Sequence, residues 1–319
     1  MKIIEPAVEI INEENPLKKI ELCGRICYKS ENMISENSSK KFIEMILKRG
    51  HTSVLEHVQF GLVDFLGSIH EIIQINSYFE NKLGQFAQPK RGFSIKNSES
   101  TLYGNIRTWL EILASNEISN PTKSIIINSI VESESLYEPF FFEFLNLKND
   151  TYCALPLKVN KDYLTVRFIC DRGVSHELVR HRVASFSQES TRYCNYSGEV
   201  VFIKPCFDWA KNIPVNQNSF NINENLITDK IDYWLGSCVN SEASYNGLID
   251  NGCSPQEARS VLPNSLKTEI IMTATYKEWE GILALRLSKA AHPQMQQIMR
   301  LLVNNKDFPK KLNLIYKNY

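Results

Sequence analysis

Apolar side chains recur every three or four residues along several stretches of the chain, the spacing that gathers them on one face of a helix. Residues 38–49 show this spacing, and Gly50 follows at a position where helices commonly end. A longer run over 227–248 stops before Gly252, and a shorter one covers 106–113. These patterns predict amphipathic helices over all three stretches.

Strand-like patterns interrupt the helices. Residues 162–171 alternate apolar and polar side chains, which is typical of a strand with one buried face, and the run 51–63 has a similar character. This mixture predicts an α+β fold in which a sheet packs against long helices. No low-complexity linker divides the chain, so we expect one domain formed by residues 1–65 and 160–319, interrupted by an inserted subdomain of unknown role at 66–159.

Two segments carry the residue order of a capping box, in which a hydroxyl side chain and a Glu three residues later satisfy backbone N–H groups at the start of a helix. They are Ser-Pro-Gln-Glu at 254–257 and Thr-Tyr-Lys-Glu at 275–278. The first predicted helix carries Arg259 and the second carries Arg286, so each cap fixes where an arginine points. Pro293 opens a last predicted helix.

The charge balance argues against polyanionic partners. Lys and Arg together number 36, as do Asp and Glu, so the 319-residue chain has no net charge. We therefore expect no nucleic acid and no membrane partner, and any bound anion must be held by a local cluster. Glu5 and Glu9 stand where a secretory signal is apolar, and no uninterrupted apolar run is long enough to span a membrane, which predicts a cytoplasmic protein.

The eight cysteines are expected to be reduced thiols. None forms a Cys-x-x-Cys pair, and a chain of this length does not need disulfides to fold. Cys23 and Cys27 lie four residues apart on a predicted helix with Leu17, Ile20 and Ile26. This spacing indicates a buried apolar face rather than half of a zinc site, so we predict no metal site.

The most informative segment is 175–198, because it concentrates cationic and hydroxyl side chains. It contains the tripeptide Arg180-His181-Arg182 and then Arg192, interspersed with serines, a threonine and tyrosines. Guanidinium groups bind phosphate oxygens in bidentate fashion and stay charged at any working pH, while hydroxyls occupy the remaining positions around a phosphate. A solvated basic turn also accounts for an isolated Arg-His-Arg, but the residues that follow favour a phosphate site.

This segment resembles the signature of the flavin-dependent thymidylate synthases, which is Arg-His-Arg, seven residues, a Ser, and then Arg-Tyr. The sequence RHRVASFSQESTRY matches it throughout. Three further segments resemble the family in the same order, namely GHTSVLEH at 50–57, EARSVLP at 257–263 and ILALRLSKAAHPQ at 282–294. The resemblance covers about residues 20–65 and 160–305 and leaves the predicted insertion outside.

The resemblance implies an enzyme that makes thymidylate (dTMP) from deoxyuridylate (dUMP). The methylene group would come from 5,10-methylenetetrahydrofolate, and the hydride from NADPH through flavin adenine dinucleotide (FAD). The resemblance also implies a homotetramer with active sites between subunits. In such an enzyme the protein stacks the flavin against the pyrimidine and fixes the phosphate, since the redox chemistry belongs to the cofactor.

The family's functional residues carry over to matching positions of this chain. The implied catalytic residues are Arg286, which holds and activates the uracil ring, and Ser190, which orients the substrate. The implied dUMP-binding residues are Glu177, Leu178, Val179, Arg180, Gln188, Glu189, Ser190, Thr191, Arg192, Arg259 and Arg286. The implied FAD-binding residues are His51, Ser53, Arg180, His181, Arg182, Gln188, Thr275, Lys277 and Gly281, with Ser53 and Gln188 coming from a neighbouring subunit.

The chain departs from the family near the second capping box. Thr275 and Lys277 replace the Asn-x-Arg of some members, and Gly281 replaces a larger polar residue. Cys194, within the signature, could act as the nucleophile of a classical thymidylate synthase, because nearby arginines would lower its pKa. The resemblance favours a thiol without a catalytic role. His57 is predicted to be a structural histidine.

Two other functions fit the same residues. One is a nucleotide- or RNA-binding module in which the arginines contact phosphates while Tyr193 and Tyr196 stack on bases, although a neutral chain argues against a nonspecific RNA binder. The other is a flavoprotein on the same scaffold with an altered substrate, suggested by the insertion and by Lys277. RNA retention at varied salt and activity with dUMP separate these functions from the synthase.

Overall fold

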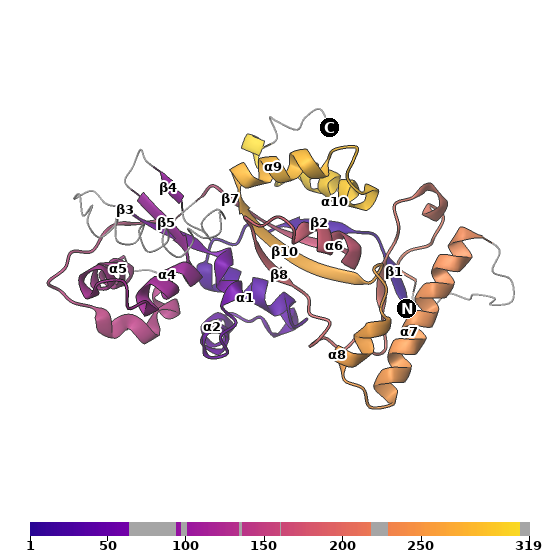
Figure 1. The fold of residues 1–319 in the computed structure, drawn as a ribbon, viewed down its shortest axis with the longest axis horizontal. Coiled ribbons are helices and arrows are strands. Elements are labelled where there is room, and N and C mark those ends of the chain that lie inside the picture. The colour runs from indigo at the N-terminus through magenta and orange to yellow at the C-terminus, as the bar shows by residue number, and fades with distance from the viewer. Residues whose placement is uncertain (64–93, 97–100, 134–135, 160, 218–228, 313–319) are drawn as a thin grey trace. The chain divides into compact units, whose positions relative to one another are not determined.

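The computed structural model describes residues 1–63, 94–96, 101–133, 136–159, 161–217 and 229–312. Its mixture of helices and small sheets confirms the predicted α+β class (Figure 1). The chain divides into two compact units, one of Met1–Ile11, Arg25–Ser30 and Leu164–Tyr319, the other of Asn12–Gly24 and Glu31–Tyr163. Residues 66–93 of the predicted insertion lie outside the described residues, and the insertion's boundaries stay a prediction.

A four-stranded sheet organises the first unit. Its strands lie in the order β2 (Ala7–Ile10), β7 (Tyr163–Asp171), β10 (Lys267–Thr275) and β8 (Ser185–Gln188). Strand β7 confirms the prediction for 162–171, because Leu164, Val166, Phe168 and Cys170 all point into the core. β8 runs antiparallel to β10, with Ile270 opposite Gln188. A separate pair joins β1 (Lys2–Ile4) to β9 (Val201–Ile203) in parallel.

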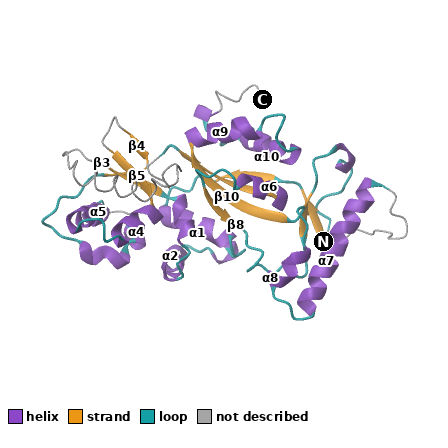
Figure 2. Cartoon of the chain, viewed as in Figure 1, coloured by secondary structure: helices purple, strands orange, loops and turns teal. Residues whose placement is uncertain are grey.

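Three helices cover the apolar face of this sheet, namely α6 (Arg172–Leu178), α9 (Tyr276–Arg286) and α10 (Pro293–Val303). Figure 2 shows α9 and α10 together over the strands. Trp279 of α9 is fully buried, and its indole Nε1 donates to the Leu164 carbonyl at 3.0 Å. His292 accepts from the Gln294 N–H and so caps α10, which begins at Pro293 as predicted.

A second apolar cluster of the first unit lies beneath the long helix α7 (Lys230–Asp250). Tyr196, Phe202 and Tyr245 are its largest members. Gly252 has a positive φ of 89°, a conformation that favours glycine, which explains the predicted end of α7. The predicted start of this helix at 227 lies outside the described residues. The short helix α8 (Pro255–Ala258) follows, and its capping box is formed as predicted.

The second unit contains a four-stranded sheet with the order β4 (Ser94–Lys96), β5 (Thr101–Asn105), β3 (Gln59–Val63) and β6 (Leu157–Val159). Its helices include α2 (Ser38–Lys48), α4 (Ile106–Ala114) and α5 (Asn120–Glu132). The first two confirm the predictions for 38–49 and 106–113. Gly50 has a φ of 68°, as expected after α2.

The prediction of a strand throughout 51–63 is wrong in its first half. Residues Thr52–His57 form a 3-10 helix, and the strand starts only at Gln59. The adjacent side chains of Val54 and Leu55 are both buried, which a strand with one buried face does not allow. A tight helical turn directs both toward the core of this unit.

The helix α1 (Pro16–Ile26) carries Cys23, which is fully buried, as its apolar face requires. All eight cysteines are free thiols, as predicted. Among the described residues no group of three or more His, Cys, Asp or Glu is placed to hold a metal ion. None of the described helices is both long and apolar enough to cross a bilayer.

Candidate active site

Arg286 ends α9 and is held by three hydrogen bonds. Its Nε donates to Nε2 of His181 at 2.9 Å, Nη1 donates to Oε2 of Glu177 at 2.7 Å, and Nη2 donates to the Glu177 carbonyl at 2.9 Å. The capping box that starts α9 is formed, with Thr275 and Glu278 bonded to each other. The structure therefore brings Arg286, at the C-terminal end of α9, into contact with the Arg-His-Arg tripeptide. Arg286 and His181 are more than 100 positions apart in the sequence.

His181 is a neutral imidazole at physiological pH. Partial burial, and then the positive charge of Arg286, lower the pKa of His181 from 6.5 to about 4. Because Nε2 accepts a hydrogen bond from Nε of Arg286, the hydrogen of the neutral ring lies on Nδ1. His181 thus acts as a hydrogen-bond acceptor that orients Arg286 and adds no positive charge to the site.

The loop after β8 gathers the hydroxyl groups of the signature. Oγ of Ser190 accepts from the N–H of Arg192 at 3.3 Å, and the N–H of Ser190 donates to the Cys27 carbonyl at 3.1 Å. Arg259 follows α8, and its Nη1 donates to Oγ1 of Thr191 at 3.2 Å. These contacts place the predicted nucleotide-binding Arg259 beside the predicted phosphate-binding loop.

Four arginines of this region expose their side chains to solvent, namely Arg180, Arg182, Arg192 and Arg259. Within the described part of the chain, neither Arg180 nor Arg182 makes a side-chain hydrogen bond or ion pair with protein. Their guanidinium donors are therefore available to a ligand. This is the donor set that a phosphate or pyrophosphate needs.

The remaining predicted dUMP residues differ in exposure. Leu178 is fully buried in the sheet core, whereas Val179 is exposed. The Glu189 side chain is only 1% exposed, and its carboxylate contacts protein groups. Nε2 of Gln188 donates to Oγ of Ser175 at 2.8 Å.

The predicted FAD residues of this region are the N-cap Thr275 of α9, Lys277 in its first turn and Gly281 at its middle. Oγ1 of Thr275 accepts from the Glu278 N–H at 3.1 Å and so belongs to the cap. Lys277 is exposed. A Cβ added at Gly281 would meet nothing within 4 Å, so this exposed helical surface is open. His51 and Ser53 belong to the second unit, next to the start of its 3-10 helix.

Cys194 and His57 have the environments expected of an unreactive thiol and a structural histidine. Burial, and then the negative charge of Glu189, raise the pKa of the Cys194 thiol to about 11, so Cys194 is protonated at neutral pH and is a poor nucleophile. Burial, together with the charge of Lys19, lowers the pKa of His57 to about 3. His57 is fully buried and neutral, as a structural histidine should be.

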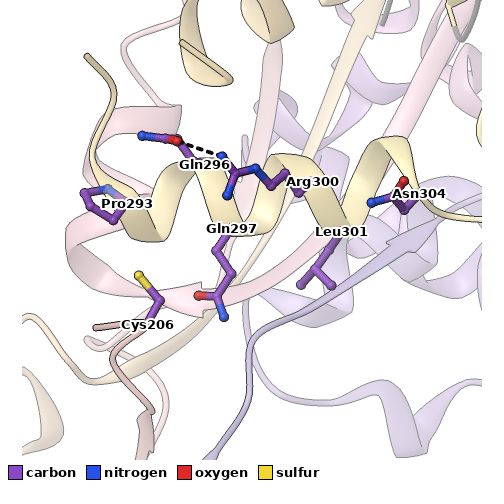
Figure 3. A pocket seen from close by; sticks show the side chains of 7 residues that line it. All are labelled: Cys206, Pro293, Gln296, Gln297, Arg300, Leu301 and Asn304. Atoms are coloured by element: carbon purple, nitrogen blue, oxygen red, sulfur yellow. Dashed lines mark hydrogen bonds between the residues drawn. The ribbon is translucent and has the colours of Figure 1, made fainter. Parts of the chain in front are cut away.

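A pocket of about 400 Å³ lies along α10 and is lined by Cys206, Pro293, Gln296, Gln297, Arg300, Leu301 and Asn304 (Figure 3). Figure 3 shows Arg300 directed back toward Gln296, to which it donates a hydrogen bond at 3.1 Å. None of these residues is a predicted site residue. This pocket is therefore separate from the Arg286 cluster.

Lys267 was not singled out from the sequence, yet it contacts the site. Its Nζ donates to Oε2 of Glu189 at 3.0 Å and also pairs with Glu269. The signal was available, because Lys267 and Glu269 lie two residues apart in a strand pattern and so share one face. Two opposite charges on the same face of one strand indicate that this face of the sheet carries a network of ion pairs.

The α+β fold thus places exposed arginines beside the hydroxyl groups of Ser190 and Thr191, and such groups are the donors that proteins use to bind phosphate. The chain belongs to the family of the thymidylate synthase complementing protein, whose model matches residues 9–63 and 160–310. The matched segments contain all the predicted site residues and leave the whole of the predicted insertion, 66–159, unmatched.

Individual relatives agree with this assignment. The flavin-dependent thymidylate synthase of Pyrococcus furiosus is 30% identical over 131 residues, which are 40% of this chain and 48% of the relative. That of Sulfurisphaera tokodaii is 32% identical over 127 residues, 40% of this chain and 43% of the relative. The chain thus spans about half the length of these relatives. The enzyme of Aquifex aeolicus is 23% identical over 297 residues, 88% of this chain and 90% of the relative.

Proposed function

We propose that this chain is a flavin-dependent thymidylate synthase that converts dUMP to dTMP. It takes the methylene group from 5,10-methylenetetrahydrofolate and reducing equivalents from NADPH through FAD. Family membership supports the proposal, and one observation carries it. Arg286, the residue expected to hold the pyrimidine, is fixed by Glu177 and His181 of the signature region.

Arg286 binds and activates the uracil ring in this proposal. A guanidinium has five N–H donors and keeps its charge at working pH. Three of them are used by His181 and Glu177, and those that remain can donate to a uracil carbonyl. A positive charge held there stabilises negative charge on the pyrimidine and so raises electron density at the carbon that is methylated.

The phosphate of dUMP is assigned to the loop that follows β8. Ser190, Thr191, Arg192 and Arg259 supply hydroxyl and guanidinium donors within one cluster. Ser190 orients the substrate, and the arginines neutralise its charge. Fixing the phosphate at one end and the ring at Arg286 leaves the nucleotide little rotational freedom, which favours reaction with a bound partner.

The residues present fit FAD. Arg180 and Arg182 are exposed cations whose donors can take a pyrophosphate, and His181 lies between them in the sequence. Lys277 and the open surface at Gly281 provide a second contact region on α9. When bound, the flavin supplies the hydride that completes the methyl group. The protein holds the cofactor and excludes competing reactions.

A homotetramer completes the site in this proposal. His51, Ser53 and Gln188 line the flavin, with Ser53 and Gln188 contributed by a neighbouring subunit. Sedimentation or light scattering of the purified protein tests this state, and a stable monomer that is fully active would contradict it.

The direct test of the function is product formation. Purified protein is incubated anaerobically with FAD, NADPH, 5,10-methylenetetrahydrofolate and dUMP, and dTMP is quantified by chromatography. The expected result is dTMP that requires every component and is lost in Arg286→Ala. Bound flavin without dTMP would instead favour a flavoprotein with another substrate.

A further inference from the structure

A side-chain hydrogen bond joins the two ends of the loop that carries Ser190, Thr191 and Arg192. The chain leaves the sheet at Glu189 and re-enters the core at Tyr196. The Tyr196 hydroxyl donates to Oε1 of Glu189 at 2.9 Å. This bond therefore joins the two ends of loop 190–195.

Both ends of the closing bond are anchored. Tyr196 is buried, and its N–H donates to the Tyr245 hydroxyl at 3.2 Å beneath α7. The N–H of Glu189 donates to the Glu269 carbonyl at 2.8 Å, which extends the pairing of β8 with β10 by one residue. Nζ of Lys267 donates to the second carboxylate oxygen of Glu189 at 3.0 Å. The loop is thereby attached to the sheet on one side and to α7 on the other.

The charges behind Glu189 compensate one another. Lys267 pairs with Glu269 as well as with Glu189, and Glu269 pairs with Arg167. Burial alone would lower the pKa of Lys267, but the two carboxylates outweigh it and raise the pKa. Lys267 is therefore charged at neutral pH. Lys29 adds a further positive charge, because its Nζ lies 3.8 Å from Oε1 of Glu189 and 5.0 Å from the centre of the Tyr196 ring.

Glu189 precedes Ser190 in the signature, but its burial separates it from any ligand. A carboxyl group that is 1% exposed is costly to bury unless its oxygens are paired, and both oxygens of Glu189 are bonded to protein groups. Its effect on a bound nucleotide must therefore pass through the backbone of the loop. Ser190 illustrates the path, since it follows Glu189 directly in the chain and its N–H donates to the Cys27 carbonyl.

We infer that Glu189 is a positioning residue, which, clamped between Lys267 and the Tyr196 hydroxyl, holds loop 190–195 in the conformation that binds the nucleotide phosphate. This inference rests on the proposed function, because the phosphate is that of dUMP. Among the residues that the structure describes, the clamp makes no contact with the flavin residues Arg180 and Arg182. Gln188, also assigned to the flavin, is held independently of the clamp, by its pairing with Ile270 and by the bond of its side chain to Ser175. Loosening it should weaken nucleotide binding and leave flavin binding intact.

Tyr196→Phe is the sharpest test, because it removes the closing hydroxyl and keeps the buried ring. We expect the Kd for dUMP, measured by calorimetry on the flavin-loaded protein, to rise about tenfold, with flavin affinity changed less than about twofold. The KM for dUMP should rise similarly while kcat at saturation stays near wild type. Amide hydrogen exchange at Ser190 and Cys194, whose N–H groups are bonded within this region, should accelerate. The matched control is Tyr233→Phe, which alters an exposed tyrosine of α7.

Glu189 itself is tested with two substitutions. A glutamine can accept from Lys267 with its oxygen and donate to the Tyr196 oxygen with its amide, so Glu189→Gln should keep most of the dUMP affinity. Glu189→Ala removes the bonds to Lys267 and to Tyr196 and should therefore lose the affinity for dUMP. Glu199→Ala, at an exposed acidic residue just beyond the loop, is the control. If Glu189→Ala fails to fold, the comparison of Tyr196→Phe with wild type still tests whether the clamp holds the loop.

The outcomes separate the inference from the proposed function. Wild-type dUMP affinity together with wild-type exchange in Tyr196→Phe would overturn the clamp. A parallel loss of flavin, kcat and thermal stability in that variant would also overturn it, since it indicates a general structural role. A wild-type protein that does not bind dUMP contradicts the proposed function, and the exchange data alone then show whether Tyr196 closes the loop.

Discussion

Nε of Arg286 donates a hydrogen bond to Nε2 of His181 over 2.9 Å, which links the last residue of α9 to the centre of the Arg-His-Arg tripeptide. The bond requires a neutral histidine, and the lowered pKa of His181 supplies one. Glu177 holds the other side of the same guanidinium. Arg286 is thus oriented before any ligand binds, which is the arrangement that electrostatic catalysis favours.

Substitution of Arg286 by Lys should depress turnover with dUMP by about 100-fold or more, because a point charge cannot reproduce a planar fork held by three bonds. Flavin binding should persist, since Arg180 and Arg182 are unaltered. Steady-state kinetics and the flavin absorbance of the purified variant measure the two effects. Arg300→Lys, at an exposed arginine of α10, is the control, and equal turnover in both variants would remove Arg286 from the mechanism.

Stability should fall as the solution becomes acidic. The pKa of His57 is about 3 in the folded protein against 6.5 when unperturbed, so the unfolded chain binds more protons between these values. The free energy of unfolding should therefore decrease below about pH 6.5, approaching about 1.4 kcal/mol per pH unit for this one group. The pKa of His181, lowered to about 4, acts in the same direction.

Urea denaturation at about pH 7.5, 6.0 and 5.0, on both sides of the ordinary histidine pKa, measures how steeply the free energy of unfolding changes with pH in wild type and in His57→Gln. The variant is less stable at neutral pH but should show a shallower dependence on pH. An identical slope in the two proteins would mean that His57 is not held neutral by the fold.

Cys194→Ala should leave turnover largely intact. The thiol has a pKa raised to about 11, and its Sγ donates to the Cys27 carbonyl at 3.7 Å, so it is neither ionised nor directed at a substrate. Stability should fall by roughly 1 kcal/mol from lost packing. Complete loss of turnover in a folded variant would restore the nucleophile hypothesis.

Two glycines should respond in opposite ways to alanine. Gly281 lies within α9 with nothing within 4 Å of an added Cβ, so Gly281→Ala should raise the free energy of unfolding by about 0.5–1 kcal/mol. At Gly24 of α1 an added Cβ would lie 2.5 Å from the Phe42 ring, so Gly24→Ala should destabilise. Denaturant unfolding of both variants checks the signs, and matching signs would contradict the packing described here.

Much of the fold could be predicted because its signals are local. Gly50 and Gly252 end helices through their own backbone conformation, and the two capping boxes start helices through residues three positions apart. The alternation in β7 identified its buried face. The stretch Thr52–His57 escaped prediction because its buried neighbours require a tight turn, which two-residue alternation does not reveal.

The resemblance named residues for the candidate site but gave no information about how their side chains are arranged. The signature and Arg286 came from a resemblance, since no local pattern indicates that Glu177 and Arg286 pair across 109 residues. The burial of Glu189 follows from alternation, because Ser185, Ser187 and Glu189 all occupy the buried face that continues from β8. Its partner Lys267 depends on the placement of β10 beside β8, which only the fold determines.

The most direct test of the central claim is the visible absorbance of the purified protein, followed in the same cuvette by anaerobic addition of NADPH with and without dUMP. The account predicts a flavin band that bleaches on reduction, and faster when the nucleotide is present. A protein that carries no flavin and binds none when FAD is added would contradict it.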